Sequence, residues 1–117
     1  GIHGPRGPED KRLPFADAAP GMAGAETLLA LSLNLVRDDL VSMNRLMTLL
    51  SGNPAKILGV KAGSFAAGSA ADLIFVDPDT PWIVDSGKMA AQAGNTPFDR
   101  VPVQGRARRI MKGGVFL

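Results

Sequence analysis

The sequence predicts an α/β chain that is helical in its first half and rich in β-strand in its second half. Two observations support this fold class. Leucines crowd residues 23–38, where they leave little polar surface on a helix. After Gly59 the apolar runs become short and β-branched, as in Leu73–Val76, which is typical of strands. The length of 117 residues is enough for one small domain with one core.

The first predicted helix covers Ala23–Asp38. Glu26 near its start and Arg37 near its end both suit the helix dipole. Because this helix is apolar on most sides, we expect it to be buried on most sides. Its neighbour is predicted to begin after Ser42, a good N-cap residue.

This second helix is predicted to end at Ser51-Gly52. A third, short helix should then follow, with Asn53 as its cap and Pro54 at its first helical position. Gly59 is its predicted stop, because glycine readily adopts the left-handed conformation that ends many helices.

In the second half, Leu73–Val76 is predicted as a strand buried on both faces. The prolines in Asp77–Pro81 predict a turn, after which Trp82–Val84 resumes as a strand. Residues 86–100 look irregular, with an ordered loop at "GNTPF".

From Val103 to Met111 the chain is again strand-like. Lys112-Gly113-Gly114 then predicts a tight hairpin turn into Val115–Leu117.

Composition excludes several kinds of protein. The net charge is only +2, so nothing demands a nucleic-acid partner. The chain has no cysteine, and its single histidine, His3, rules out an internal cluster of histidine ligands. No apolar run approaches the roughly 20 residues that cross a bilayer, and no signal peptide is visible. We therefore expect a soluble, cytoplasmic chain without a membrane partner.

Two charged clusters are candidate sites. Arg106, Arg108 and Arg109 could meet an anion, and Arg106 and Arg108 would share one face of a strand. The adjacent pairs Glu9-Asp10 and Lys11-Arg12 could act as acid and base groups. In both cases a solvated surface is the favoured interpretation, because charged side chains are mostly exposed.

A family resemblance extends this interpretation. The segment "NPAKILGVKAGSFAAGSAADLIFVDPDTPWIVD" resembles the C-terminal signature of the metal-dependent amidohydrolase superfamily. Within this superfamily, the class I dihydroorotases have a pattern to which "KRLPFADAAPGMAGAETLLALSLNLV" is similar. The stretches "NTPFD" and "GRARRIMKGGVFL" resemble the closing strands of the same family. The resemblance covers nearly the whole chain.

The resemblance implies an architecture. Residues 1–59 would be the last loop and the closing helices of an amidohydrolase TIM barrel, after its eighth strand. Residues 60–117 would be the C-terminal part of a small composite β-sandwich. Residues 5–21 would form the substrate loop, since TIM-barrel sites are built from the loops that follow the strands.

The resemblance also implies an activity. A zinc-dependent dihydroorotase opens and closes the ring between dihydroorotate and N-carbamoyl-aspartate in pyrimidine biosynthesis. In this chain Ile2 occupies the position of the family's metal-binding, proton-shuttling aspartate. We therefore expect no catalytic residue and no zinc ligand in this segment, and no activity from the segment alone. The expected substrate-binding residues are Arg6, Pro20 and Gly21.

Two alternatives stay open at this stage. The complete protein is either a working hydrolase, with a hydantoinase- or allantoinase-type enzyme as a variant, or a non-catalytic homologue that serves as a structural subunit. In both cases we expect the rest of the barrel, or a partner chain, to cover this segment, and we expect a homo-oligomer.

Overall fold

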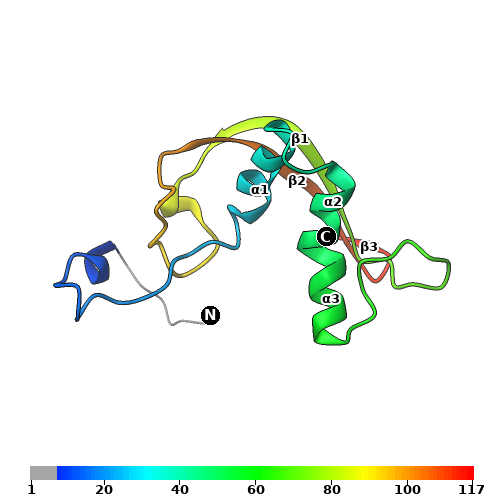
Figure 1. The fold of residues 1–117 in the computed structure, drawn as a ribbon, viewed down its shortest axis with the longest axis horizontal. Helices are drawn as coiled ribbons and strands as arrows, with labels where there is room; N and C mark the ends of the chain where they lie inside the picture. The colour runs from blue at the N-terminus through cyan, green and yellow to red at the C-terminus, as the bar shows by residue number, and fades with distance from the viewer. Residues whose placement is uncertain (1–7) are drawn as a thin grey trace. The chain divides into compact units, whose positions relative to one another are not determined.

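The computed structural model describes residues 8–117, so Ile2, His3 and Arg6 lie outside the described residues. Helices precede strands, as predicted (Figure 1). The principal elements are α1 (Leu28–Arg37), α2 (Met43–Met47), α3 (Asn53–Leu58), β1 (Leu73–Ile83), β2 (Pro102–Lys112) and β3 (Val115–Phe116). Within this part of the chain, no helix is long and apolar enough to span a membrane.

Helix α1 begins at Leu28, later than the predicted Ala23, and ends at Arg37, one residue before the predicted end. Its burial was predicted wrongly. Leu33 is buried at 2% exposure, but Leu28 is 53% exposed and Leu35 39%. Leu29 and Leu31 are half-buried, so the described part of the chain covers this helix only in part.

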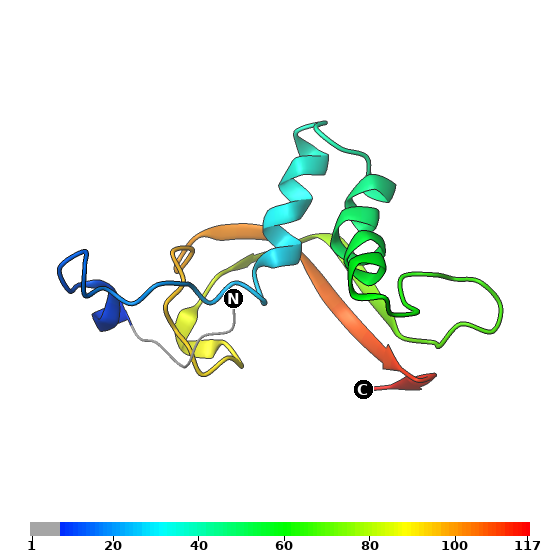
Figure 2. The same cartoon turned by 60° about the horizontal axis from the view of Figure 1, so that its bottom comes forward.

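Helix α2 begins as predicted. Ser42 Oγ accepts a hydrogen bond from the backbone N–H of Arg45 at 3.2 Å, which caps the first turn. Figure 2 shows α1 joined to this second helical stretch by a short loop.

The predicted stop at Ser51-Gly52 is wrong. The chain stays helical through a π-helical turn, η2 (Thr48–Gly52), and continues directly into α3. Gly52 keeps helical backbone angles, and Asn53 lies inside the helix instead of capping it. Pro54 does not interrupt this path, because it falls in the first turn of α3, where a missing N–H costs little.

The predicted stop at Gly59 is confirmed. Gly59 adopts φ +67°, and its N–H donates to the carbonyl of Lys56 at 3.3 Å. The N–H of Val60 reaches back to the carbonyl of Ala55 at 3.0 Å, the pattern of a Schellman end.

Strand β1 contradicts the predicted turn at Asp77–Pro81, because Leu73–Ile83 forms one continuous strand. It lies at an edge of the three-stranded sheet β1-β2-β3, and edge strands tolerate proline. The Asp77 carboxylate accepts the N–H groups of Asp79 and Thr80 at 3.0 and 3.2 Å without reversing the chain. The predicted burial on both faces is also wrong, since Ile74 is 64% exposed.

The hairpin between β2 and β3 is confirmed. Gly113 and Gly114 both have positive φ angles, +56° and +84°, as a type I′ turn requires. The strands pair antiparallel with Met111 opposite Phe116. The guanidinium of Arg109 stacks over the Phe116 ring at 3.8 Å.

The chain divides into two compact units. One joins the residues up to Leu28 with Pro81–Val103, and its buried residues include Thr27, Val84 and Asn95. The other joins Leu29–Thr80 with Gln104–Leu117. Its core is made by Ala30, Leu33, Leu46 and Ala55. The expected boundary between residues 59 and 60 concerns the complete enzyme and stays a prediction.

Candidate functional site

Residues 8–21 form a closed, hydrogen-bonded loop. It starts with a short 3-10 helix, η1 (Pro8–Lys11). A turn follows, in which the N–H groups of Asp17 and Ala18 donate to the carbonyl of Pro14 at 2.8 and 2.9 Å. The loop then returns to its own start, where Ala19 N–H donates to the carbonyl of Asp10 at 3.0 Å. It is the described part of segment 5–21, which the sequence predicts as the substrate loop.

Two side chains hold the end of this loop. Lys11 Nζ donates hydrogen bonds to the carbonyl oxygens of both Ala19 and Gly21. Asn95 Nδ2, from the segment before Pro97, donates to the same Gly21 oxygen at 3.1 Å. The Asn95 carbonyl in turn accepts the N–H of Ala23 at 3.2 Å. We call Lys11 and Asn95 the loop clamp.

The predicted substrate-binding residues Pro20 and Gly21 lie at the clamped end of the loop, and both are exposed. Gly21 has φ +84°, a conformation that side-chain-bearing residues rarely adopt. Arg6, the third predicted residue, lies outside the described residues. Whether these residues contact substrate stays a prediction.

The clamp was not foreseen from the sequence. Lys11 and its charged neighbours were interpreted as a solvated loop, and Glu9 and Arg12 are indeed exposed. Lys11 differs, because the residue is half-buried and its ammonium group donates hydrogen bonds to backbone carbonyls. Asn95 is only 7% exposed, and no sequence motif indicated that a residue far along the chain would reach Gly21.

The residues of the cluster Arg106, Arg108 and Arg109 make contacts within the chain. Arg108 Nε lies 3.6 Å from Asp77 Oδ2, and Arg109 stacks on Phe116. Hydrogen bonds from the Thr80 hydroxyl and the Asp79 N–H lower the pKa of Asp77 and keep its carboxylate charged. Arg108 and Arg109 therefore have partners within this unit.

The described residues do not fit a zinc ion. Within residues 8–117, no group of three or more histidine, cysteine, aspartate or glutamate side chains is placed to hold a metal. The carboxylates of Asp85 and Asp99, between β1 and β2, accept hydrogen bonds from backbone N–H groups instead. Asp99 accepts the Ser86 N–H at 2.8 Å, which lowers its pKa, and Asp85 accepts the Gly87 N–H at 3.1 Å.

Comparison with known proteins identifies the family. Residues 16–117 match the amidohydrolase family. The chain belongs to this family. The predicted resemblance to dihydroorotases is confirmed by curated relatives of that name: the dihydroorotase of Geobacter metallireducens is 39% identical over 112 residues, which are 96% of this chain. That of Syntrophus aciditrophicus is 43% identical over 96 residues, 82% of this chain.

The chain spans only about a quarter of these amidohydrolases, 26% of the Geobacter protein and 22% of the Syntrophus protein. Solved structures of the family show the same fold. The L-hydantoinase (dihydropyrimidinase) from Arthrobacter aurescens has a TM-score of 0.79 at 33% identity, covering 86% of this chain and 23% of its own. A D-hydantoinase has a TM-score of 0.81 at 22% identity, covering 92% and 24%, and supports the fold alone. The helices and antiparallel sheet described above are thus part of an amidohydrolase fold.

Proposed function

We propose that this chain is part of a dihydroorotase, a cyclic amidohydrolase that interconverts dihydroorotate and N-carbamoyl-aspartate in pyrimidine biosynthesis. The observation that carries the proposal is the similarity to dihydroorotases, which runs along 96% of the chain at 39% identity. The proposal rests on sequence similarity, because a fold alone does not specify a reaction.

The loop of residues 5–21 would contact the substrate. Gly21 would bring its backbone close to the ring, since it carries no side chain that would keep the ligand away. Arg6 would meet the substrate carboxylate, because a guanidinium pairs with a carboxylate through two parallel hydrogen bonds. Neither role involves breaking the ring, so both residues would act on binding.

The architecture proposed for the complete protein follows from the same family. Residues 1–59 would close a TIM barrel after its eighth strand, and residues 60–117 would complete a small β-sandwich. The exposed leucines of α1 and the exposed apolar side chains of β1 support a further layer on this segment, formed by the rest of the barrel or by a partner chain. A homo-oligomer in the cytoplasm is part of the proposal.

Zinc is the proposed cofactor of the complete enzyme, where it would activate the water that attacks the ring. Its ligands would have to lie outside residues 8–117, because this part of the chain holds no suitable group. We therefore assign no described residue to the metal.

Two alternatives have specific support. The 33% identity to the Arthrobacter L-hydantoinase supports a hydantoinase-type substrate. Ile2, at the position of the family's aspartate, supports a non-catalytic homologue that serves as a structural subunit.

Turnover assays on the complete protein that carries this segment separate these possibilities. The purified protein is supplied with zinc and tested on dihydroorotate, on N-carbamoyl-aspartate and on a 5-substituted hydantoin. Higher kcat/KM for the first two compounds supports the dihydroorotase. A preference for the hydantoin supports the hydantoinase, and no turnover of any of them supports the structural subunit.

A further inference from the structure

The loop clamp acts on the two peptide groups that flank the Pro20–Gly21 peptide group. The Ala19 carbonyl belongs to the peptide group before Pro20, and the Gly21 carbonyl belongs to the one after Gly21. Lys11 donates to both of them, and Asn95 donates to the second. The peptide group that joins Pro20 to Gly21 lies between the two clamped groups, and its own N–H and carbonyl are used by neither clamp residue.

We infer that Lys11 is a positioning residue that orients the Pro20–Gly21 peptide group for a polar, ring-shaped substrate. The inference rests on the proposed function, because it takes these two residues as the substrate contact. Lys11 itself would not touch the substrate. Its ammonium group would fix the direction of a backbone N–H that does.

The geometry makes Lys11 the more important of the two clamp residues. Asn95 holds only the Gly21 side of the dipeptide. Lys11 holds both sides, so its ammonium group bridges the Ala19 and Gly21 carbonyls directly. A positive φ at Gly21 depends on such support, because glycine is free to leave that conformation.

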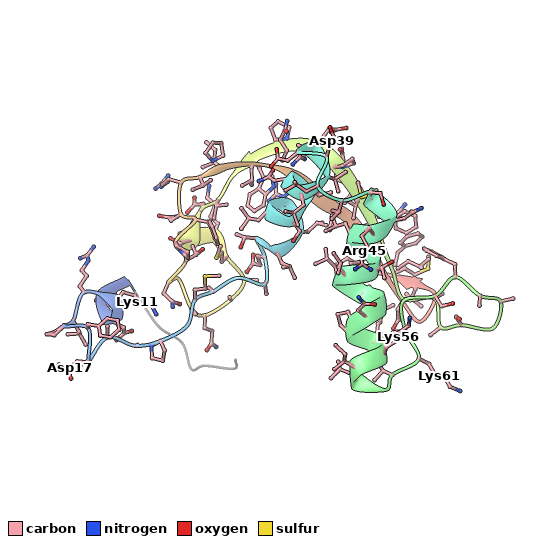
Figure 3. All side chains as sticks on the ribbon, in the orientation of Figure 1. Lys11, Asp17, Asp39, Arg45, Lys56 and Lys61 are labelled. Atoms are coloured by element: carbon pink, nitrogen blue, oxygen red, sulfur yellow. The ribbon has the colours of Figure 1, made fainter. Side chains whose placement is uncertain are left out.

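The clamp is first tested by amide hydrogen exchange in the complete protein, which requires no activity. In Lys11→Met the methylene stem is kept and the donors are lost, so exchange should become faster in the peptide that contains residues 12–22. Lys61→Met is the matched control, since Lys61 is exposed and lies beyond α3 (Figure 3). Unchanged exchange in Lys11→Met would overturn the clamp.

The role in substrate binding is tested by the kinetics of the same variants. We expect Lys11→Met to raise KM for dihydroorotate about tenfold, with kcat changed less than about twofold, because the loss is in binding geometry. Lys11→Arg should restore most of the affinity, since a guanidinium also carries several donors. Lys61→Met should match the wild type.

The outcomes distinguish this inference from the proposed function. If the wild type does not turn over dihydroorotate, the proposed function fails while the exchange experiment still decides the clamp. If the wild type is active and the loop of Lys11→Met loosens with KM unchanged, the positioning role is wrong. A fall in kcat at constant KM would also overturn it.

Discussion

Gly105 lies directly against Leu33. A Cβ atom built on Gly105 would stand 2.2 Å from Leu33 Cδ1 and 3.3 Å from the carbonyl oxygen of Pro78. Leu33 is only 2% exposed, so its side chain has no room to move away. The absence of a side chain at Gly105 thus lets helix α1 pack onto strand β2 within this unit.

Gly105→Ala should therefore lower the free energy of unfolding of the complete protein by about 3 kcal/mol, through overpacking and through strain at φ +104°. Urea denaturation measures the change. Gly68→Ala is the matched control, because Gly68 has φ +87° and nothing within 4 Å of the added Cβ. If Gly105→Ala and Gly68→Ala lower the free energy of unfolding equally, the contact with Leu33 contributes nothing to the effect.

The charge of the Asp72 carboxylate should make the stability of the β2–β3 hairpin depend on pH. Its carboxylate accepts hydrogen bonds from the Lys112 ammonium and from the Gly113 N–H, and both lower its pKa. The folded pKa is thus below the ordinary value of about 3.9, so the stabilisation is complete above that pH and is lost as pH falls through the folded value.

Asp72→Asn should consequently destabilise the complete protein at pH 7, and the difference from wild type should shrink as pH falls below about 4. Thermal unfolding of both proteins across this range measures it. Because the asparagine oxygen can still accept the Gly113 N–H, a difference that is constant with pH would point to packing instead of charge.

Gly21→Val should weaken substrate binding without unfolding the complete protein. Gly21 is exposed, so the fold can accommodate the side chain, but valine disfavours φ +84° and would project toward the ligand. We expect KM to rise about tenfold or more, measured alongside the melting temperature. Gly68→Val carries similar strain outside the loop, and an equal KM in the two variants would argue against the substrate loop.

The isolated 117-residue segment should be associated or molten. Its described part leaves large apolar side chains uncovered, among them Ile57 at 84% and Phe65 at 93% exposure. Burying one such side chain is worth about 1.5–3 kcal/mol, so several of them match the entire stability of a typical domain. Analytical ultracentrifugation and a thermal melt check this, and a compact monomer with a sharp cooperative transition would contradict it.

Local signals in the sequence were reliable where one residue determines the structure. Ser42 capped its helix, Gly59 ended one, and Gly113-Gly114 formed the hairpin turn. Each depends on backbone angles or on a hydrogen bond within a few residues, which the sequence encodes directly.

Signals that depend on distant residues were less reliable. Pro78 and Pro81 were interpreted as a turn, but their position in an edge strand makes them acceptable there, and sequence does not show which strand is an edge. The burial of α1 was overestimated for a related reason. The apolar residues of a helix indicate that other segments of the fold bury it, but they do not show which segments do so. Of the candidate site, Pro20 and Gly21 are predicted from the family pattern and their role stays a prediction, while the contact of Asn95 with Gly21 depends on tertiary structure.

The π-helical turn η2 has a consequence for length changes in this region. A π turn takes about one residue more than an α-helical turn, so the residues after it are rotated by about 100° from where an unbroken α-helix would place them. Deleting one residue between Thr48 and Gly52 would convert the π turn into an ordinary α-helical turn and leave Ile57 and Leu58 on the side that they now face. Inserting one residue would rotate them by about 100°, so this stretch should tolerate the loss of a single residue better than its gain.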